Sequence, residues 1–297
     1  MKIVINTDQK KMVLRDQNEP SVFYNFDAND FKFNLFFNRW LDLLSTIREN
    51  EFTKRDRKIH VWHIAAPKSG STWLTTILKE LLHWNVSPLI PSYDRREQEI
   101  SELNLVYPAM NNFVFSPHQH CRYSEATNKI IEKMNIKPIL QYRNIFDTVI
   151  SFSDHCNQGQ LNFPMAYMDD VNWECLDKNK KMDFIIDMIV PWYFNFYAGW
   201  FSSDLVKDGK ILPVSYEDLV SDPSGQIKRI IQWIGIEKTE DEINASIVSS
   251  MNNKTRKNVG VPGRGTLLSF DQMQKIRTMA SYYPTIDFTF LGLWLVR

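Results

Sequence analysis

The feature that most constrains the fold is a change of hydrophobic pattern across residues 59–82. Residues 59–66, IHVWHIAA, form a short apolar run that reads as a strand. The loop 67–71, PKSGS, follows, and beyond it apolar residues recur at helical spacing in TWLTTILKELL. The pattern therefore predicts a strand, a loop and a helix in direct succession.

The same succession recurs along the chain. Further short apolar runs occupy residues 112–116, 138–143 and 210–216. The second run leads into a helix with Asn144 as its N-cap, and the third precedes a helix bounded by Asp222 and Gly235. Strands that alternate with helices predict an α/β fold, in which helices cover both faces of a mainly parallel central sheet. Such sheets bind ligands beyond the carboxyl ends of their strands, where the PKSGS loop falls.

Length and composition narrow the class of protein. The 297 residues are 43% apolar and carry no repeat or Gly/Ser linker, so we expect a single domain spanning residues 1–297. Lys and Arg balance Asp and Glu at 35 each, so no overall field attracts nucleic acid or a membrane surface. No secretory core or membrane-spanning stretch is apparent, which predicts a cytoplasmic protein.

The loop after the first predicted strand is suited to holding a tetrahedral anion. Gly70 permits close backbone approach, and the N–H groups that open the following helix point toward a ligand. Lys68 adds a positive charge. Hydroxyl donors stand at Ser69, Ser71 and Thr72. The sequence therefore predicts an anion site in a nucleotide-binding core that is similar to a P-loop.

A nucleotide kinase or other P-loop phosphotransferase is one alternative. In those proteins the lysine follows the last glycine of the loop, whereas Lys68 precedes Gly70. They also use a carboxylate at a strand end to help hold Mg²⁺, and the strand predicted at 138–143 ends in Arg143 instead. Both differences argue against hydrolysis of ATP or GTP.

With Lys68 ahead of the glycine and Trp73 directly after the hydroxyls, PKSGSTW resembles the 5′-phosphosulfate loop of sulfotransferases. These enzymes, here of the cytosolic type, use 3′-phosphoadenosine 5′-phosphosulfate (PAPS) as the donor. RNIFDTVIS is similar to the family's R-N-x-x-D-x-x-x-S segment, which implies that Arg143 and Ser151 bind the 3′-phosphate. From the residues alone, an ion pair between Arg143 and Asp147 is an equally good interpretation.

Two further segments extend the resemblance. SYEDLVSDP contains the family's Y-E-D-L sequence, and WYFNFYAGWF resembles the aromatic helix before it. Tyr216 and Trp73 are accordingly the candidates for packing on the purine. The match covers roughly residues 59–280, in the order that the family has.

The last family motif, R-K-G-x-x-G, is displaced here. Aligning the two glycines of TRKNVGVPGRG with the motif leaves Arg256 and Lys257 two residues early. Three cations, Arg256, Lys257 and Arg264, are candidates for binding the 3′-phosphate.

The resemblance also nominates a catalytic base. Placing S-P-H of FVFSPHQH on the family's K-T-H selects His118, with His120 as the second candidate. A histidine, with an ordinary pKa near 6.5, can accept a hydroxyl proton at neutral pH. Ser116 replaces the family lysine, so any stabilisation that this lysine gives the transferring group must come from Lys68 or be absent. Cys121 lies nearby, but no spaced partner pair completes a metal site, and we expect no metal.

The resemblance implies transfer of the sulfuryl group to a hydroxyl or amine of a small molecule, with adenosine 3′,5′-bisphosphate (PAP) as the other product. Residues 152–178 occupy the position of the family's acceptor lid and mix aromatic residues with carboxylates, so a cationic acceptor is one hypothesis. An inactive, nucleotide-binding member of the fold is another alternative. The sequence gives no oligomeric state, and it indicates free thiols for its three cysteines.

Overall fold

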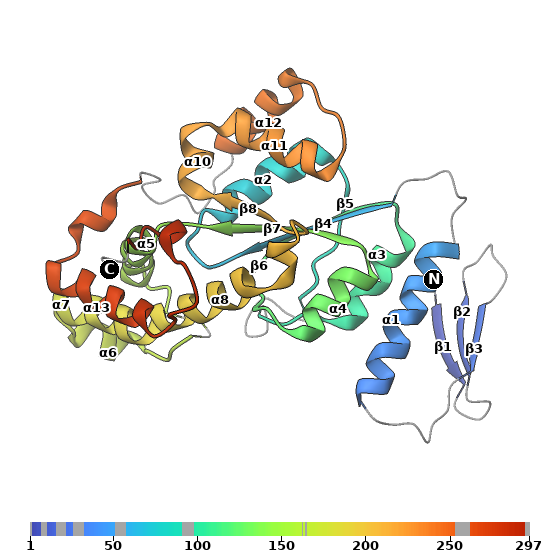
Figure 1. The fold of residues 1–297 in the computed structure, drawn as a ribbon, viewed down its shortest axis with the longest axis horizontal. Helices are drawn as coiled ribbons and strands as arrows, with labels where there is room; N and C mark the ends of the chain where they lie inside the picture. Colours follow the sequence, from blue (N-terminus) through green and yellow to red (C-terminus); the bar gives the residue numbers. More distant parts are fainter. Residues whose placement is uncertain are drawn as a thin grey trace.

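The computed structural model describes residues 2–6, 11–15, 22–25, 33–50, 58–90, 98–161, 163, 165–252 and 262–294. Its centre is a five-stranded sheet in the order β5-β6-β4-β7-β8, and all neighbouring strands are parallel (Figure 1). The strands are β4 (Ile59–Ala65), β5 (Asn85–Val86), β6 (Phe113–Gln119), β7 (Ile136–Tyr142) and β8 (Leu212–Ser215). The α/β fold predicted from the sequence is thus confirmed.

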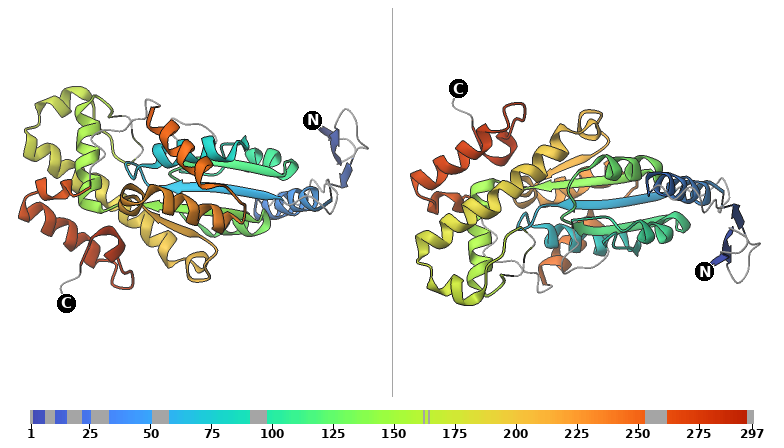
Figure 2. Two further views of the ribbon diagram at one scale, coloured as in Figure 1. Left: turned by 90° about the horizontal axis from the view of Figure 1, so that it is seen from above. Right: turned by 90° about the horizontal axis from the view of Figure 1, so that it is seen from below.

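Helices cover both faces of this sheet. Successive side chains of a strand point to opposite sides, and the apolar strands therefore have hydrophobic residues to bury on each face. Val61 of β4 belongs to one hydrophobic cluster, whereas its neighbour Trp62 belongs to the other. The Val61 side is covered by α2 (Ser71–Leu82), α11 (Pro223–Ile234) and α12 (Glu240–Asn252). The Trp62 side is covered by α1 (Phe33–Asn50), α3 (Val106–Met110), α4 (Glu125–Lys133) and α8 (Val190–Ser202), as Figures 1 and 2 show.

The remaining elements are as follows. The helices are α5 (Ile145–Asn157), α6 (Asp170–Cys175), α7 (Lys178–Phe184), α9 (Asp204–Lys207), α10 (Tyr216–Ser221) and α13 (Phe270–Ser281). Shorter helical turns are η1 (Glu102–Leu105), η2 (Ile185–Ile189), η3 (Arg264–Leu267) and η4 (Thr289–Leu291). Strands β1 (Lys2–Asn6), β2 (Lys11–Arg15) and β3 (Val22–Asn25) form an antiparallel sheet of their own, which our sequence analysis did not anticipate. The single domain for residues 1–297 stays a prediction.

The helix starts depend on the side chains that the sequence indicated. Asn144 accepts hydrogen bonds from the backbone N–H groups of Phe146 and Asp147, at 3.0 and 3.3 Å, and so caps α5. Asp222 caps α11 in the same way, and Gly235 ends that helix with a φ of 81°. Both predicted N-caps are therefore confirmed.

Two strands end one residue earlier than predicted. The strand expected at 138–143 ends at Tyr142, so Arg143 lies just beyond it. The strand expected at 210–216 spans Leu212–Ser215, and Tyr216 begins α10 instead. The reason is local, because the Ser215 hydroxyl accepts a hydrogen bond from the Asp218 N–H and caps the helix there.

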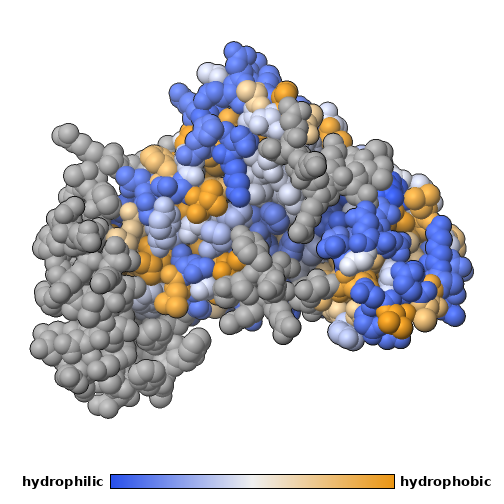
Figure 3. All heavy atoms as spheres, turned by 180° about the vertical axis from the view of Figure 1, so that it is seen from behind, coloured by the Kyte–Doolittle hydropathy of each residue, from blue (hydrophilic) through white to orange (hydrophobic). Residues whose placement is uncertain are grey.

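The surface and the thiols add two observations. On the face drawn in Figure 3, hydrophobic residues occur in small groups between hydrophilic ones over the described part of the chain. Within the described residues, no helix is both long and apolar enough to cross a membrane. Cys121, Cys156 and Cys175 are free thiols, as the sequence indicated.

Candidate active site

The loop between β4 and α2 lies at the carboxyl edge of the sheet. The Ser69 hydroxyl is buried and donates to the carbonyl of Ala66 at 2.6 Å, which tightens the turn. Lys68 and Gly70 both have left-handed backbones, with φ values of 63° and 83°. Ser71 and Thr72 open α2, where the first backbone N–H groups of a helix have no partner within the helix. The loop therefore presents donors and the positive end of a helix to the same side.

Gly70 is required by the packing under the loop. A Cβ atom at this position would overlap the ring of Tyr216, and its positive φ would strain any other residue. Tyr216 is buried beneath the loop rather than exposed beside it. Trp73 is buried as well, and its indole Nε1 donates to the Ser250 hydroxyl at 3.1 Å. The structure brings both aromatic candidates to the loop, and their contact with a purine stays a prediction.

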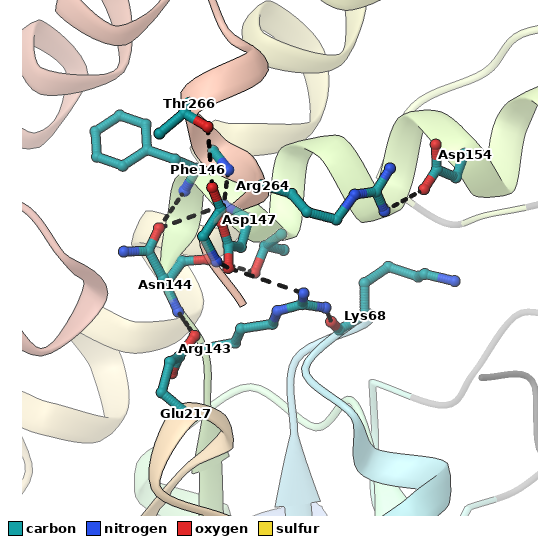
Figure 4. Close-up of polar contacts among 12 residues, drawn as sticks. Lys68, Arg143, Asn144, Phe146, Asp147, Asp154, Glu217, Arg264 and Thr266 are labelled. Atoms are coloured by element: carbon teal, nitrogen blue, oxygen red, sulfur yellow. Dashed lines mark hydrogen bonds and ion pairs between the residues drawn. The ribbon is translucent and has the colours of Figure 1, made fainter. Parts of the chain in front are cut away.

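Arg143 joins the loop to the neighbouring strand end. Its Nη1 donates to the carbonyl of Lys68 at 3.1 Å (Figure 4). Its guanidinium carbon lies 4.3 Å from the centre of the Tyr216 ring. The side chain is buried, and its Nε has no hydrogen-bond partner among the described residues. A buried N–H donor without a partner is costly, so an anionic ligand that accepts from it would be favoured.

Asp147 links Arg143 to the C-terminal loop. The carboxylate accepts hydrogen bonds from the backbone N–H groups of Gly263 and Gly265, at 2.7 and 2.6 Å. Its contact with Arg143 is longer, at 4.0 Å from Nη2. Asp147 therefore acts mainly as an anchor for the loop, and the ion pair that the sequence left open is the weaker of its contacts.

Of the three candidate cations in the displaced family motif, the structure describes Arg264. Arg264 donates to Asp154 of α5 at 2.6 Å, so its charge is already paired (Figure 4). Arg256 and Lys257 lie outside the described residues. Ser151, the other residue expected at the 3′-phosphate, is buried on α5 about two turns beyond Arg143.

A β-bulge positions His118 at the end of β6. Trp62 pairs with Ser116 and Ile64 pairs with Gln119, so β6 has one residue more than β4 over this stretch. Such an extra residue bends the strand and redirects its side chains, often beside an active site. His118 is thus the second-last residue of β6, whereas we expected it just past the strand.

The second histidine and the substituted lysine also have defined places. His120 follows β6, and its Nδ1 lies 2.7 Å from the carbonyl of Ala65, which can only accept. Ser116 is fully buried and donates to the carbonyl of Ser87 at 2.6 Å. A lysine at position 116 would place its charge inside the sheet, where burying an unpaired charge is costly.

These features agree with comparisons to known proteins. The sulfotransferase domain model matches residues 58–262. The chain belongs to the sulfotransferase family. It is 27% identical over 192 residues to a flavonol 4′-sulfotransferase of Flaveria chlorifolia, and 25% identical over 213 residues to a flavonol sulfotransferase-like protein of Flaveria bidentis. These matches include 62% and 65% of this chain but only 58% and 62% of the relatives, so the chain spans about three fifths of their length.

Solved structures of this sulfotransferase fold resemble most of the chain. A mouse sulfotransferase, SULT7A1, complexed with PAP superposes with a TM-score of 0.58 at 15% identity, covering 95% of this chain and 97% of that one. Retinol dehydratase in complex with androsterone and PAP gives 0.50 at 13% identity, covering 84% and 86%. At these identities the likeness establishes the fold.

Two buried histidines of the sulfotransferase predict its response to acid. Burial lowers the pKa of His60 and that of His63 to about 3, so both imidazoles are neutral in the folded protein. In the unfolded chain their pKa returns to about 6.5. Their contribution to stability is therefore fully present above about pH 6.5 and is lost as the pH falls toward about 3.

We expect the free energy of unfolding to fall in this window by up to about 1.4 kcal/mol per pH unit for each histidine. Urea unfolding of the wild type and of His60→Gln, compared across this pH range, measures the effect. The variant should lose part of the slope. An identical slope in both proteins would show that His60 does not take up its proton on unfolding.

Sequence reasoning missed the polar residues that support this site. Three of them were not singled out: His63 and Gln141, which lie in apolar strands, and Thr75, which lies on an apolar helix. The sequence did carry a signal for them. A polar residue inside an apolar strand is buried and needs a hydrogen-bond partner, so His63 and Gln141 on neighbouring strands predict a shared network.

Proposed function

We propose that this sulfotransferase uses PAPS to sulfate a hydroxyl or amine of a small molecule. The observation that carries this proposal is the contact between Arg143 and the loop carbonyl of Lys68, at 3.1 Å. It joins the residue expected at the 3′-phosphate to the loop expected at the 5′-phosphosulfate. PAPS has anionic groups at both positions, whereas ATP has none at the 3′ position.

The residues present fit such a donor. The Nε of Arg143 is a buried donor without a partner among the described residues, and the bare backbone of Gly70 leaves the loop open to close approach. The PAP complexes of the mouse sulfotransferase and of retinol dehydratase, which share the fold, support the same donor.

In the proposed reaction, the acceptor oxygen or nitrogen forms a bond to sulfur, and the bond from sulfur to the bridging oxygen of the donor breaks. The bonding electrons leave with that oxygen on PAP. Lys68 offsets the negative charge that develops there. His118 accepts the acceptor's proton at Nε2, as a general base.

Two acidic residues of the lid region cap helices. The Asp169 carboxylate accepts from the Asn172 N–H at 2.8 Å and caps α6, and Asp177 caps α7 in the same way. Trp173 is buried, and the ammonium of Lys181 already lies 5.2 Å from its ring. The cationic-acceptor hypothesis thus gains no support. The flavonol sulfotransferases among the relatives make phenols the first acceptors to test.

Replacing Asp169 with asparagine is expected to leave the Michaelis constant for the acceptor unchanged. Asparagine is an equally good N-cap, so the helix is preserved while the charge is removed. Steady-state kinetics on the variant and the wild type measure the effect. A large rise in the Michaelis constant for an amine acceptor, but not for a phenol, would restore the cationic hypothesis.

Transfer of radiolabelled sulfate from PAPS to panels of phenols, alcohols and amines tests the proposed function. We expect a labelled product in at least one panel, with release of an equal amount of PAP. Tight binding of PAP with no transfer to any panel would instead indicate an inactive, nucleotide-binding member of the family.

A further inference from the structure

Four polar side chains, one of them His118, form a continuous hydrogen-bonded chain. The Gln141 amide oxygen lies 3.0 Å from Nε2 of His63, and the His63 Nδ1 lies 2.9 Å from the Thr75 hydroxyl. The same hydroxyl lies 3.0 Å from Nδ1 of His118. The chain crosses from β7 through β4 and α2 to β6. Gln141, His63 and Thr75 are all buried.

The positions of the protons follow from this order. His63 is neutral, because burial lowers its pKa to about 3, so its ring carries one proton. The amide oxygen of Gln141 can only accept, which places that proton on Nε2 of His63. The Nδ1 of His63 must then accept from the hydroxyl of Thr75.

The Thr75 oxygen, having donated its only proton, can accept from His118. Two His118 groups face it, namely the ring Nδ1 at 3.0 Å and the backbone N–H at 3.3 Å. A hydroxyl oxygen has two lone pairs, which match these two donors. The ring proton of His118 therefore lies on Nδ1, and the lone pair lies on Nε2.

Which atom donates in each hydrogen bond of this series depends on how the Gln141 amide is oriented. If the amide were reversed, every donor and acceptor would exchange roles, and His118 would carry its proton on Nε2. The observed orientation instead turns the amide nitrogen of Gln141 toward the loop, 3.6 Å from the position of a Cβ on Gly70. That nitrogen is buried without a hydrogen-bond partner among the described residues. A donor is favoured beside an anion-binding loop, and a carbonyl oxygen is not.

We propose that Gln141, His63 and Thr75 are positioning residues that hold His118 in the tautomer with its lone pair on Nε2. This inference rests on the proposed function, in which His118 is the base. A base acts from the correct tautomer only, and a third group that orients it is a recurring part of such sites. Here three neutral side chains supply the orientation.

The matched variants are Thr75→Val, which removes the hydroxyl at similar volume, and Thr75→Ser, which keeps it. We expect Thr75→Val to lower kcat by about 10- to 100-fold, somewhat less than the ~10² to 10⁴ that a general base contributes. PAP affinity should be unchanged, because the nucleotide contacts are intact. Thr75→Ser should restore most of the activity. Equal kcat values for wild type and Thr75→Val would overturn the proposal.

The tautomer itself is measured by NMR of the full-length protein with ¹⁵N-labelled histidine rings. His118→Asn identifies the signals of His118, and the long-range couplings of the ring show which nitrogen carries the proton. We expect Nδ1 of His118 to be protonated in the wild type and a mixture of tautomers in Thr75→Val. A proton on Nε2 in the wild type would overturn the inference, even if Thr75→Val did not fold.

This measurement also separates the inference from the proposed function. The spectrum needs no turnover, so the expected signals without any PAP binding would contradict the proposed function and leave the tautomer standing. Sulfate transfer by a protein whose His118 carries its proton on Nε2 would support the proposed function and contradict the tautomer inference.

Discussion

Replacing His118 with alanine is expected to lower kcat for sulfate transfer by about 10² to 10⁴, the usual contribution of a general base. The affinity for PAP should change little, because the loop and Arg143 hold the nucleotide. Nδ1 of His118 lies 3.0 Å from the Thr75 hydroxyl, so the ring is already oriented before an acceptor binds. Single-turnover kinetics with saturating PAPS measure the effect on the chemical step.

His120→Ala is the matched control. The centres of the His118 and His120 rings are 5.9 Å apart. His120 is held by the carbonyl of Ala65, whereas His118 is held by the hydroxyl of Thr75. We expect this variant to keep most of the wild-type kcat. If His118→Ala were fully active and His120→Ala inactive, the base would be His120. Full activity of both would point to water as the proton acceptor.

Replacing Arg143 with alanine is expected to weaken PAP binding by about 10²- to 10⁴-fold, since a bidentate arginine makes two charge-assisted hydrogen bonds of ~1.5 to 3 kcal/mol each. The loss should be confined to ligands with a 3′-phosphate. Calorimetry of PAP and of 5′-AMP with wild type and variant measures this difference, because 5′-AMP lacks the group that Arg143 would bind.

Arg143→Lys provides a second comparison. Lysine keeps the charge but lacks the planar fork, so it should recover only a small part of the PAP affinity. Arg143 also holds the loop through the Lys68 carbonyl, and a general distortion would weaken both nucleotides equally. Equal losses for PAP and 5′-AMP would therefore contradict a 3′-phosphate contact and indicate a purely structural role.

The sequence was sufficient for the core of the fold, because local signals decided it. The N-caps Asn144 and Asp222 and the apolar run at β4 each have a mechanism that acts within a few residues. The parallel sheet follows from alternating strands and helices. These predictions needed no knowledge of distant contacts.

The details of the site depend on contacts between distant segments, which one sequence does not show. Tyr216 is a candidate for packing on the purine, but the sequence does not show that its ring lies under Gly70 and against Arg143. The bulge that carries His118 is visible only in the pairing of β6 with β4. An ion pair of Asp147 with Arg143 was one of two interpretations of the motif, whereas the main bonds of Asp147 are to two glycines more than a hundred residues away.

The most direct test of the account is calorimetric titration of the wild-type protein with PAP, ATP and 5′-AMP, first without and then with Mg²⁺. We predict tight binding of PAP that needs no Mg²⁺, with much weaker binding of the two nucleotides that lack a 3′-phosphate. Preference for ATP, dependent on Mg²⁺, would contradict the account and identify the PKSGSTW loop as part of a phosphotransferase.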